Sequence, residues 1–254
     1  MLGIGRRQHS EATTAYTEEE QRELMTAFGK DKSWLRLRVE DGVRVALTKA
    51  YHTVKVDPQN YLEHLRMAYD LPALTYNGVY SVPLDLLDRI ADEAIQTTRK
   101  MAAAEGAGLG LGGIFTVLPD LGILSGLTLR MIQKLSLIYG YEYNSDDEVA
   151  ELWVAAASAA GVDLSRDLLE KNVVNRLIPR IIQKIAARAS TEFVEKWTGR
   201  VIPVASSLIG GVLNYYFVRG WGERAHAHFR KKHLEARQRM HQTALASAQS
   251  GIVR

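Results

Sequence analysis

Apolar residues recur every three or four positions over most of this chain, a spacing that is typical of amphipathic helices. It predicts helices over about 34–53, 58–70, 83–104 and 171–189. In the first of these the apolar face consists of Leu35, Val39, Val43, Ala46, Leu47 and Ala50. Residues 79–82 are too few to predict a strand, and no other segment predicts one. The pattern therefore predicts an all-α fold.

Local signals mark where some of these helices begin and end. Asp57 followed by Pro58 is an N-cap with proline at the first helical position. Ser145 and Glu148 form a capping box, which predicts a helix start. Gly140 follows a long apolar run and is predicted to end its helix.

Two places are expected to depart from regular helix. Pro179 lies inside the periodic segment 171–189 and should kink or divide it, because proline lacks the backbone N–H of a helix interior. Residues 71–81 contain proline, asparagine and glycine and predict a loop, where Tyr76 and Tyr80 could be exposed.

The stretch from Glu105 to Tyr143 organises the chain and is rich in glycine. Each glycine in a helix interior costs about 1 kcal/mol relative to alanine, so a compensating contact is expected. Spacings of four place glycines on one helix face, where a second helix can approach closely. This helix-packing role is predicted for Gly106, Gly108, Gly110, Gly112, Gly122, Gly126, Gly210 and Gly211. The prediction is a compact multi-helix domain built around glycine-rich helical segments.

The same run also matches the dinucleotide-binding fingerprint G-x-G-x-x-G at Gly108, Gly110 and Gly113. That fingerprint requires a strand immediately before it. Residues 83–104 instead predict a helix, so close helix packing is the favoured interpretation and no cofactor is expected.

Two segments are almost free of charge. Asp120 is the one charged residue between Gly106 and Leu129, and 201–218 contains none. As a helix, 201–218 would reach about 27 Å, just short of a hydrocarbon core of about 30 Å. We therefore expect neither segment to span a bilayer. Both fit better as buried core helices, or as hairpins that dip into one leaflet.

Several motifs in this region follow one another in a recognisable order: the glycine-rich run, Pro119-Asp120-Leu121, Leu129-Arg130-Met131-Ile132-Gln133 and Tyr139-Gly140-Tyr141. Together they resemble the central signature of the EcsC protein family. The resemblance is best over about 84–161 and extends to about residue 230. It implies a mostly helical bacterial protein, and the founding member of the family is encoded beside an ABC transporter. It implies no established reaction and no catalytic residues.

Composition sets further limits. The chain has 254 residues, of which 46% are hydrophobic and 24% charged, which is ordinary globular usage. We expect a flexible tail over 1–16, a single helical domain over 17–240 and a second flexible tail over 241–254. The chain has no cysteine, which excludes disulfides and allows a reducing cytoplasm. No apolar signal-peptide region is visible at the N-terminus. The expected location is cytoplasmic, with peripheral attachment to the inner face of the membrane as one option.

A stripe of cations follows the helix predicted over 171–189. Arg176, Arg180, Lys184 and Arg188 step by four, so they form one slanted line around the helix. A basic amphipathic helix can lie on an anionic membrane surface. It can equally be a core helix with a solvated basic face, and both interpretations stay open here.

Four polar residues in the glycine-rich stretch are candidates for binding a lipid or another ligand: Asp120, Arg130, Gln133 and Lys134. A charge inside an apolar segment is costly and tends to be paired or functional. The alternative for Asp120 is a carboxylate that satisfies free amides at a helix N-terminus. The alternative for the other three is a solvated rim.

No catalytic motif, metal site or nucleic-acid motif is apparent. His226 and His228 lie about 200° apart on a helix, and His226 and His233 are two turns apart, so neither pair is expected to share a metal. Residues 219–240 carry a net charge of about +5 but lack interleaved aromatic residues for stacking on bases.

Three functions therefore remain open. The first is a non-enzymatic protein associated with the membrane or with a membrane protein, with lipid as a candidate ligand. The second is a hydrolase that acts on a lipid or peptide. The third is a soluble protein–protein interaction module. The sequence leaves the oligomeric state undetermined.

Overall fold

The computed structural model describes residues 32–109, 117–163, 174–198 and 207–252. These residues form helices and, within those ranges, no strand. The helices are α2 (Lys32–Thr53), α3 (Pro58–Tyr69), α4 (Leu84–Leu109), α5 (Val117–Ile138), α6 (Asp146–Ala159), α8 (Val174–Thr198) and α9 (Ser207–Ile252), and residues Tyr76–Ser81 form the 3₁₀ helix η1. The all-α prediction is confirmed.

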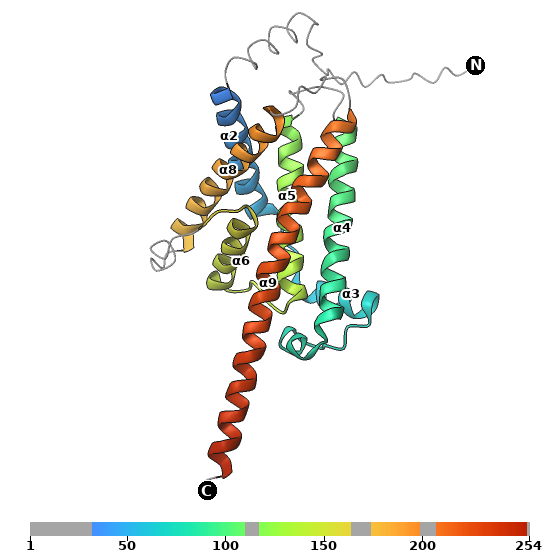
Figure 1. The fold of residues 1–254 in the computed structure, drawn as a ribbon, viewed down its shortest axis with the longest axis vertical. Helices are drawn as coiled ribbons and strands as arrows, with labels where there is room; N and C mark the ends of the chain where they lie inside the picture. Colours follow the sequence, from blue (N-terminus) through green and yellow to red (C-terminus); the bar gives the residue numbers. More distant parts are fainter. Residues whose placement is uncertain (1–31, 110–116, 164–173, 199–206, 253–254) are drawn as a thin grey trace, which may run out of the picture.

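Helix α5 lies at the centre of the bundle. It contacts α2, α3, α4, α6 and α9, and α4, α5 and α9 run side by side over much of their length (Figure 1). Its side chains are buried on several faces, including Leu129, Met131, Ile132, Leu135 and Ile138. A helix that is apolar around most of its circumference belongs in the middle of a core, and Arg130 marks the exposed side of α5. The second apolar segment of the glycine-rich stretch therefore forms the central helix.

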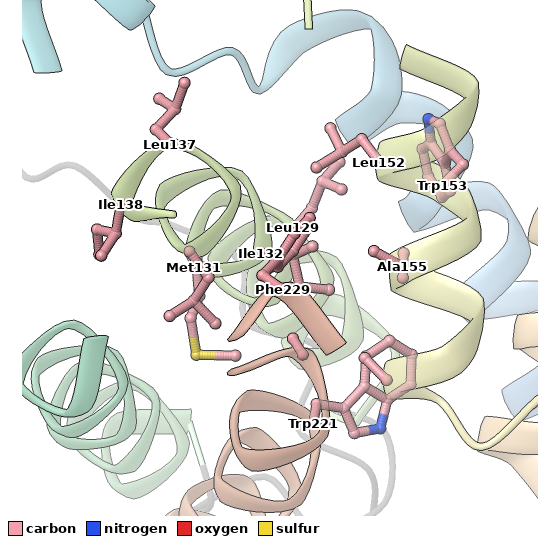
Figure 2. Packing of buried hydrophobic residues seen from close by; sticks show 14 of the residues in the cluster. Leu129, Met131, Ile132, Leu137, Ile138, Leu152, Trp153, Ala155, Trp221 and Phe229 are labelled. Atoms are coloured by element: carbon pink, nitrogen blue, oxygen red, sulfur yellow. The ribbon is translucent and has the colours of Figure 1, made fainter. Parts of the chain in front are cut away.

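Large side chains from several helices fill the space around α5. Met131 and Ile132 of α5, Trp153 of α6, and Trp221 and Phe229 of α9 are all buried in one continuous cluster (Figure 2). Fully burying a side chain of this size contributes roughly 1.5–3 kcal/mol. Contacts of this kind join α5, α6 and α9 into one body.

The predicted start signals have the expected geometry. The Asp57 side chain accepts a hydrogen bond from the Asn60 amide at 2.8 Å, and Pro58 opens α3. At α6 the Ser145 hydroxyl accepts from the Glu148 amide at 3.3 Å, and the Glu148 carboxylate accepts from the Ser145 amide at 2.9 Å. Both contacts are local, so the sequence alone was enough to predict them.

The end of α5 at Gly140 also has the predicted position. Gly140 has φ +86°, and the amides of Gly140 and Tyr141 donate to the carbonyls of Leu137 and Ser136 at 3.0 and 2.9 Å. This is a Schellman closure, in which a left-handed residue satisfies the last free carbonyls. An added Cβ at Gly140 would lie 3.2 Å from the Tyr76 carbonyl oxygen and 3.3 Å from the Tyr80 ring. Both the conformation and the space therefore require glycine.

Pro179 lies inside the continuous helix α8, so the helix is not divided, and the expected kink stays a prediction. Two local expectations differ from the structure. Tyr76 is buried rather than exposed, because its hydroxyl donates to the Pro58 carbonyl at 2.5 Å and its ring joins the core. Residues 241–252, expected to be a flexible tail, continue α9. This last segment is rich in alanine, and extending an existing helix avoids the cost of starting one.

The glycines that were predicted to pack against another helix differ in their surroundings. Gly122 is exposed, and an added Cβ there would meet no atom within 4 Å, so it is not at a close helix contact. At Gly126 the nearest atom would be Val54 Cγ2, at an ordinary 3.8 Å. Gly106 and Gly108 lie in α4 and Gly210 and Gly211 in α9, but their surroundings, and Gly110 and Gly112 altogether, fall outside the described residues.

The closest approach at a described glycine occurs at Gly222, which the sequence did not single out. An added Cβ at this position of α9 would lie 2.9 Å from Ile95 Cγ2 on α4 and 3.2 Å from Met131 Sδ on α5. Contacts shorter than normal van der Waals distance force the neighbours to move. Gly222 therefore allows α9 to pack closely against α4 and α5.

Candidate functional site

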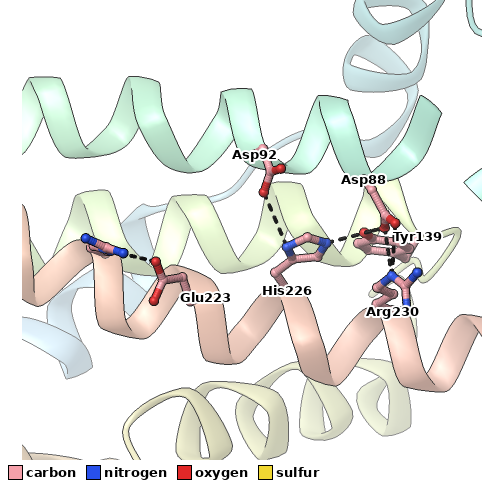
Figure 3. Close-up of polar contacts among 7 residues, drawn as sticks. Asp88, Asp92, Tyr139, Glu223, His226 and Arg230 are labelled. Atoms are coloured by element: carbon pink, nitrogen blue, oxygen red, sulfur yellow. Dashed lines mark hydrogen bonds and ion pairs between the residues drawn. The ribbon is translucent and has the colours of Figure 1, made fainter. Parts of the chain in front are cut away.

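A cluster of polar side chains joins α4, α5 and α9 (Figure 3). The Asp88 carboxylate lies at its centre and accepts hydrogen bonds from the Tyr139 hydroxyl at 2.6 Å and from Arg230 Nε at 2.9 Å. His226 Nε2 lies 3.4 Å from the same carboxylate, and His226 Nδ1 lies 3.5 Å from Asp92 Oδ1. We call Asp88, Asp92, Tyr139, His226 and Arg230 the polar cluster.

Helical spacing explains how the sequence builds the polar cluster. Asp88 and Asp92 are four apart on α4, and His226 and Arg230 are four apart on α9, so each pair lies on one face. Tyr139 directly follows α5 and brings its ring between these faces, stacked on His226 with 5.6 Å between ring centroids. These side chains were missed as a site in the sequence, because the four-residue spacings on α4 and α9 do not show that the two faces meet.

The contacts of Asp88 favour its charged form. Partial burial alone would raise the pKa of this carboxyl, but hydrogen bonds from Tyr139, Arg230 and His226 together hold the pKa below its ordinary value. At Tyr139 burial, and then the hydrogen bond to Asp88, raise the pKa of the phenol well above its ordinary range. The hydroxyl therefore remains a proton donor to a carboxylate, which makes this a charge-assisted hydrogen bond.

The side chains of the polar cluster are paired with one another, which limits the chemistry that they can perform. Each imidazole nitrogen of His226 faces a carboxylate, and no serine or threonine hydroxyl hydrogen-bonds to it among the described residues. Within the described ranges no group of three or more His, Asp or Glu side chains could hold a metal ion. The arrangement fits a clamp that joins three helices.

A second layer of contacts continues the polar cluster at the end of α5. His233 Nδ1 lies 3.0 Å from the Tyr139 carbonyl oxygen, and the His233 ring stacks on Tyr80 at 5.0 Å. Tyr80 in turn donates to the Gly140 carbonyl at 3.4 Å. Lys232 lies over the Tyr141 ring at 4.7 Å and pairs with Glu151. The motif Tyr139-Gly140-Tyr141 is thus the meeting point of α5, η1 and α9.

The four predicted ligand residues all lie on α5, but the structure describes the side chains of only three of them. Asp120 lies in the first turn of α5, and its side chain falls outside the described residues. Arg130 is ten residues further along the same helix, which corresponds to about 15 Å, and its side chain is exposed. Ten residues of helix therefore separate these two positions along α5, and a ligand role for Asp120 stays a prediction.

Gln133 has a structural role that the sequence did not predict. Its side chain is buried, its Oε1 accepts from the Val56 amide at 3.0 Å, and its Nε2 donates to the Val54 carbonyl at 3.0 Å. The amide group thus satisfies the backbone of the α2–α3 connection and is unavailable to a ligand. Lys134 is half-buried, with its ammonium 5.6 Å from the centre of the Tyr61 ring. Burial, and then the nearby charge of Arg130, lower the pKa of Lys134.

The predicted cation stripe lies on the outer face of α8. Arg180, Lys184 and Arg188 are exposed, and the side chain of Arg176 falls outside the described residues. The opposite face is buried and consists of Ile178, Ile181, Ile182, Ile185 and Ala189. We call Arg180, Lys184 and Arg188 the basic face. Its surroundings fit either interpretation from the sequence, a solvated face or a membrane-contacting one.

No helix in the described part of the chain is both long enough and apolar enough to cross a membrane. The structure describes the uncharged segment 201–218 only from Ser207, where α9 begins, and residues 110–116 of the other uncharged segment also lie outside the described residues. The expectation that neither segment spans a bilayer therefore remains a prediction.

Comparison with known proteins shows which family this chain resembles. A model of the EcsC protein family matches residues 29–234. The chain is 25% identical to Protein EcsC of Bacillus subtilis (strain 168) over 194 residues, which cover 74% of this chain and 81% of that protein. It is 25% identical to the uncharacterized protein YdbA of the same organism over 148 residues, or 54% of each chain. No solved structure matches. Because the family match spans most of the chain, including the polar cluster and the basic face, this protein belongs to the EcsC protein family.

Proposed function

We propose that this protein is a non-enzymatic, peripheral membrane-surface protein that contacts anionic lipid headgroups on the cytoplasmic side through the basic face of α8. The observation that carries this proposal is the exposure of Arg180, Lys184 and Arg188 on one outer surface. The isoleucine face behind them is fully used in packing, so the cations are held in a fixed row on a rigid helix.

The expected strength follows from the charges. Each cation near an anionic membrane surface contributes about 1 kcal/mol, so three contribute about 3 kcal/mol in total. Exposed charges are screened over about 8–10 Å at ordinary ionic strength. Binding should therefore be reversible, require anionic lipid and weaken as salt rises.

The test is co-sedimentation with vesicles of phosphatidylcholine alone or mixed with phosphatidylglycerol. The variant Arg180→Gln/Lys184→Gln/Arg188→Gln removes the basic face. The matched control, Arg66→Gln/Arg89→Gln/Lys100→Gln, removes three exposed cations from α3 and α4 and changes the net charge equally. We expect wild type and control to bind the anionic vesicles and the α8 variant to lose binding.

Two results would overturn the proposal. Equal loss in both triple variants would show that net charge rather than the basic face controls binding. Absence of wild-type binding to anionic vesicles at low salt would remove the membrane surface as the partner. Circular dichroism of each variant checks that the helices are intact.

The hydrolase alternative would use the polar cluster, which contains an imidazole and two carboxylates. Its present contacts do not favour that use, because Asp88 is already occupied by Tyr139, Arg230 and His226. We propose instead that the polar cluster stabilises the packing of α4, α5 and α9, which positions α8 through their shared core.

A further inference from the structure

The last part of α9 projects beyond the rest of the protein (Figure 1). Helix α9 has 46 residues, and every residue from 238 to 247 is exposed, including Met240 and Leu245. In proteins most of the stability of a helix comes from packing an apolar face against a neighbour. The face of this exposed end has no such neighbour among the described residues, and its sequence indicates which partner fits it.

A coiled-coil spacing runs along one face of this end. The positions are Leu234, Gln238, His241, Leu245, Ala248 and Ile252, which are separated alternately by four and three residues. An average spacing of 3.5 residues is the signature of a seam between two supercoiled helices. Two polar positions in an otherwise apolar seam are a common way of fixing its register.

The seam is symmetric about Thr243. Antiparallel pairing of two copies of α9 centred there would place Leu234 opposite Ile252, Gln238 opposite Ala248, and His241 opposite Leu245. Each polar position then meets an apolar one, and each layer occurs twice, as a two-fold interface requires. The same sequence thus supplies both halves of the interface.

A groove at the base of the projecting helix offers space for the end of the second helix. It lies between η1 and α9, and its lining includes Asn77, Tyr80, Leu234, Arg237, Gln238 and His241. In the antiparallel register the last turn of the second α9 would reach Leu234 and thus enter this groove. The groove shares Leu234, Gln238 and His241 with the seam, so the groove and the seam lie on the same side of α9.

Charge also favours the antiparallel orientation. Residues 242–252 contain no Asp, Glu, Lys or Arg, whereas Arg237 and Arg239 lie just before them. In the antiparallel register these two arginines lie level with Gln249 and Ser247 of the second copy, near its helix C-terminus. Cations are favourable at a helix C-terminus. Parallel pairing would instead bring the arginines of both copies to the same level.

We propose that this protein forms a homodimer through an antiparallel coiled coil of α9, with the two-fold axis at the level of Thr243. The occupant of the η1–α9 groove is the C-terminal end of α9 from the second copy. The basic face lies on a different helix, so this dimer does not depend on the membrane proposal.

The first test is sedimentation velocity on the full chain over a concentration series. We expect wild type to form a dimer and Leu245→Glu to halve the observed mass, because the substitution puts a charge in the seam. The control, Leu37→Glu, changes an exposed leucine on α2 and should remain dimeric. A monomeric wild type throughout the series, or a dimeric Leu245→Glu, would overturn the proposal.

The second test reports orientation by oxidative cross-linking, which is clean because the chain has no cysteine. Gln238→Cys and Ala248→Cys should cross-link when the two variants are mixed, since these positions lie opposite each other. Neither variant should cross-link to itself. In the antiparallel register, the same position in the two copies is ten residues, or about 15 Å, apart along the axis. That distance is beyond the reach of a disulfide. Self-cross-linking of each variant with none between them would overturn the antiparallel arrangement.

Discussion

Tyr139 and Asp88 are 51 positions apart in the sequence, yet the phenol hydroxyl of one donates to the carboxylate of the other at 2.6 Å. The hydrogen bond joins the end of the central helix α5 to α4, and Arg230 brings α9 to the same carboxylate. One tyrosine of the Tyr-Gly-Tyr motif thereby links three helices.

Removing that hydroxyl should destabilise the protein measurably. We expect Tyr139→Phe to lower the free energy of unfolding by about 1–3 kcal/mol, because Asp88 loses a charge-assisted hydrogen bond while staying partly buried. Urea denaturation measures the change. Tyr51→Phe is the control, since the Tyr51 hydroxyl makes no hydrogen bond within the described residues, and it should change stability by less than about 0.5 kcal/mol. Equal effects in both variants would contradict the role given to the polar cluster.

Buried His233 should make stability depend on pH. Burial lowers the pKa of its imidazole below the ordinary value of 6.5. The unfolded chain therefore takes up a proton near pH 6.5 that the folded protein does not, and stability falls as pH decreases through this range, by up to about 1.4 kcal/mol per pH unit for one proton.

The variant His233→Asn isolates this effect, because asparagine can still donate to the Tyr139 carbonyl but does not titrate. Urea denaturation at several values between pH 7.5 and pH 5.5 should give a smaller loss of stability in the variant than in wild type. His228, whose pKa burial also lowers, remains in both proteins and cancels in the difference. Identical pH dependence would show that His233 does not titrate differently on unfolding.

Two glycines should respond in opposite directions to alanine. Gly222→Ala places a Cβ 2.9 Å from Ile95 Cγ2 and should destabilise by about 1–3 kcal/mol through overpacking. Gly122→Ala adds a methyl group to an exposed helix position and should stabilise by about 0.5–1 kcal/mol. Thermal unfolding of both variants gives the sign of each change in stability directly. Destabilisation by Gly122→Ala would contradict this prediction and support the packing role predicted for this glycine from the sequence.

Removing the side-chain amide of Gln133 should lower the free energy of unfolding. Gln133→Leu leaves the partly buried Val54 carbonyl and Val56 amide without their side-chain partner. An unsatisfied group costs about 1–3 kcal/mol when it is fully buried, so we expect a loss of roughly 1–3 kcal/mol in total by denaturant titration. Gln96→Leu, at an exposed position on α4, is the control and should have little effect. A Gln133→Leu variant as stable as wild type would reopen its candidacy as a ligand residue.

The sequence by itself determined the features that depend on near neighbours. The Asp57 cap, the Ser145–Glu148 capping box and the left-handed Gly140 each use groups within five residues, so their chemistry is complete in a short window. Helical periodicity likewise determined the all-α class and the buried face of α2 with Val39, Val43 and Leu47. These contacts form wherever the local chain is helical.

Only the tertiary structure decided which faces meet. Gly222 is at a close contact and Gly122 is not, although both lie inside helices, because the difference lies in α4 and α5 side chains far along the chain. Gln133 satisfies a backbone segment 77 to 79 positions away, and Arg230 reaches Asp88 across 142 positions. Helical spacing shows which residues share a face. The partner of that face depends on how several helices fill one core together, which no short segment encodes.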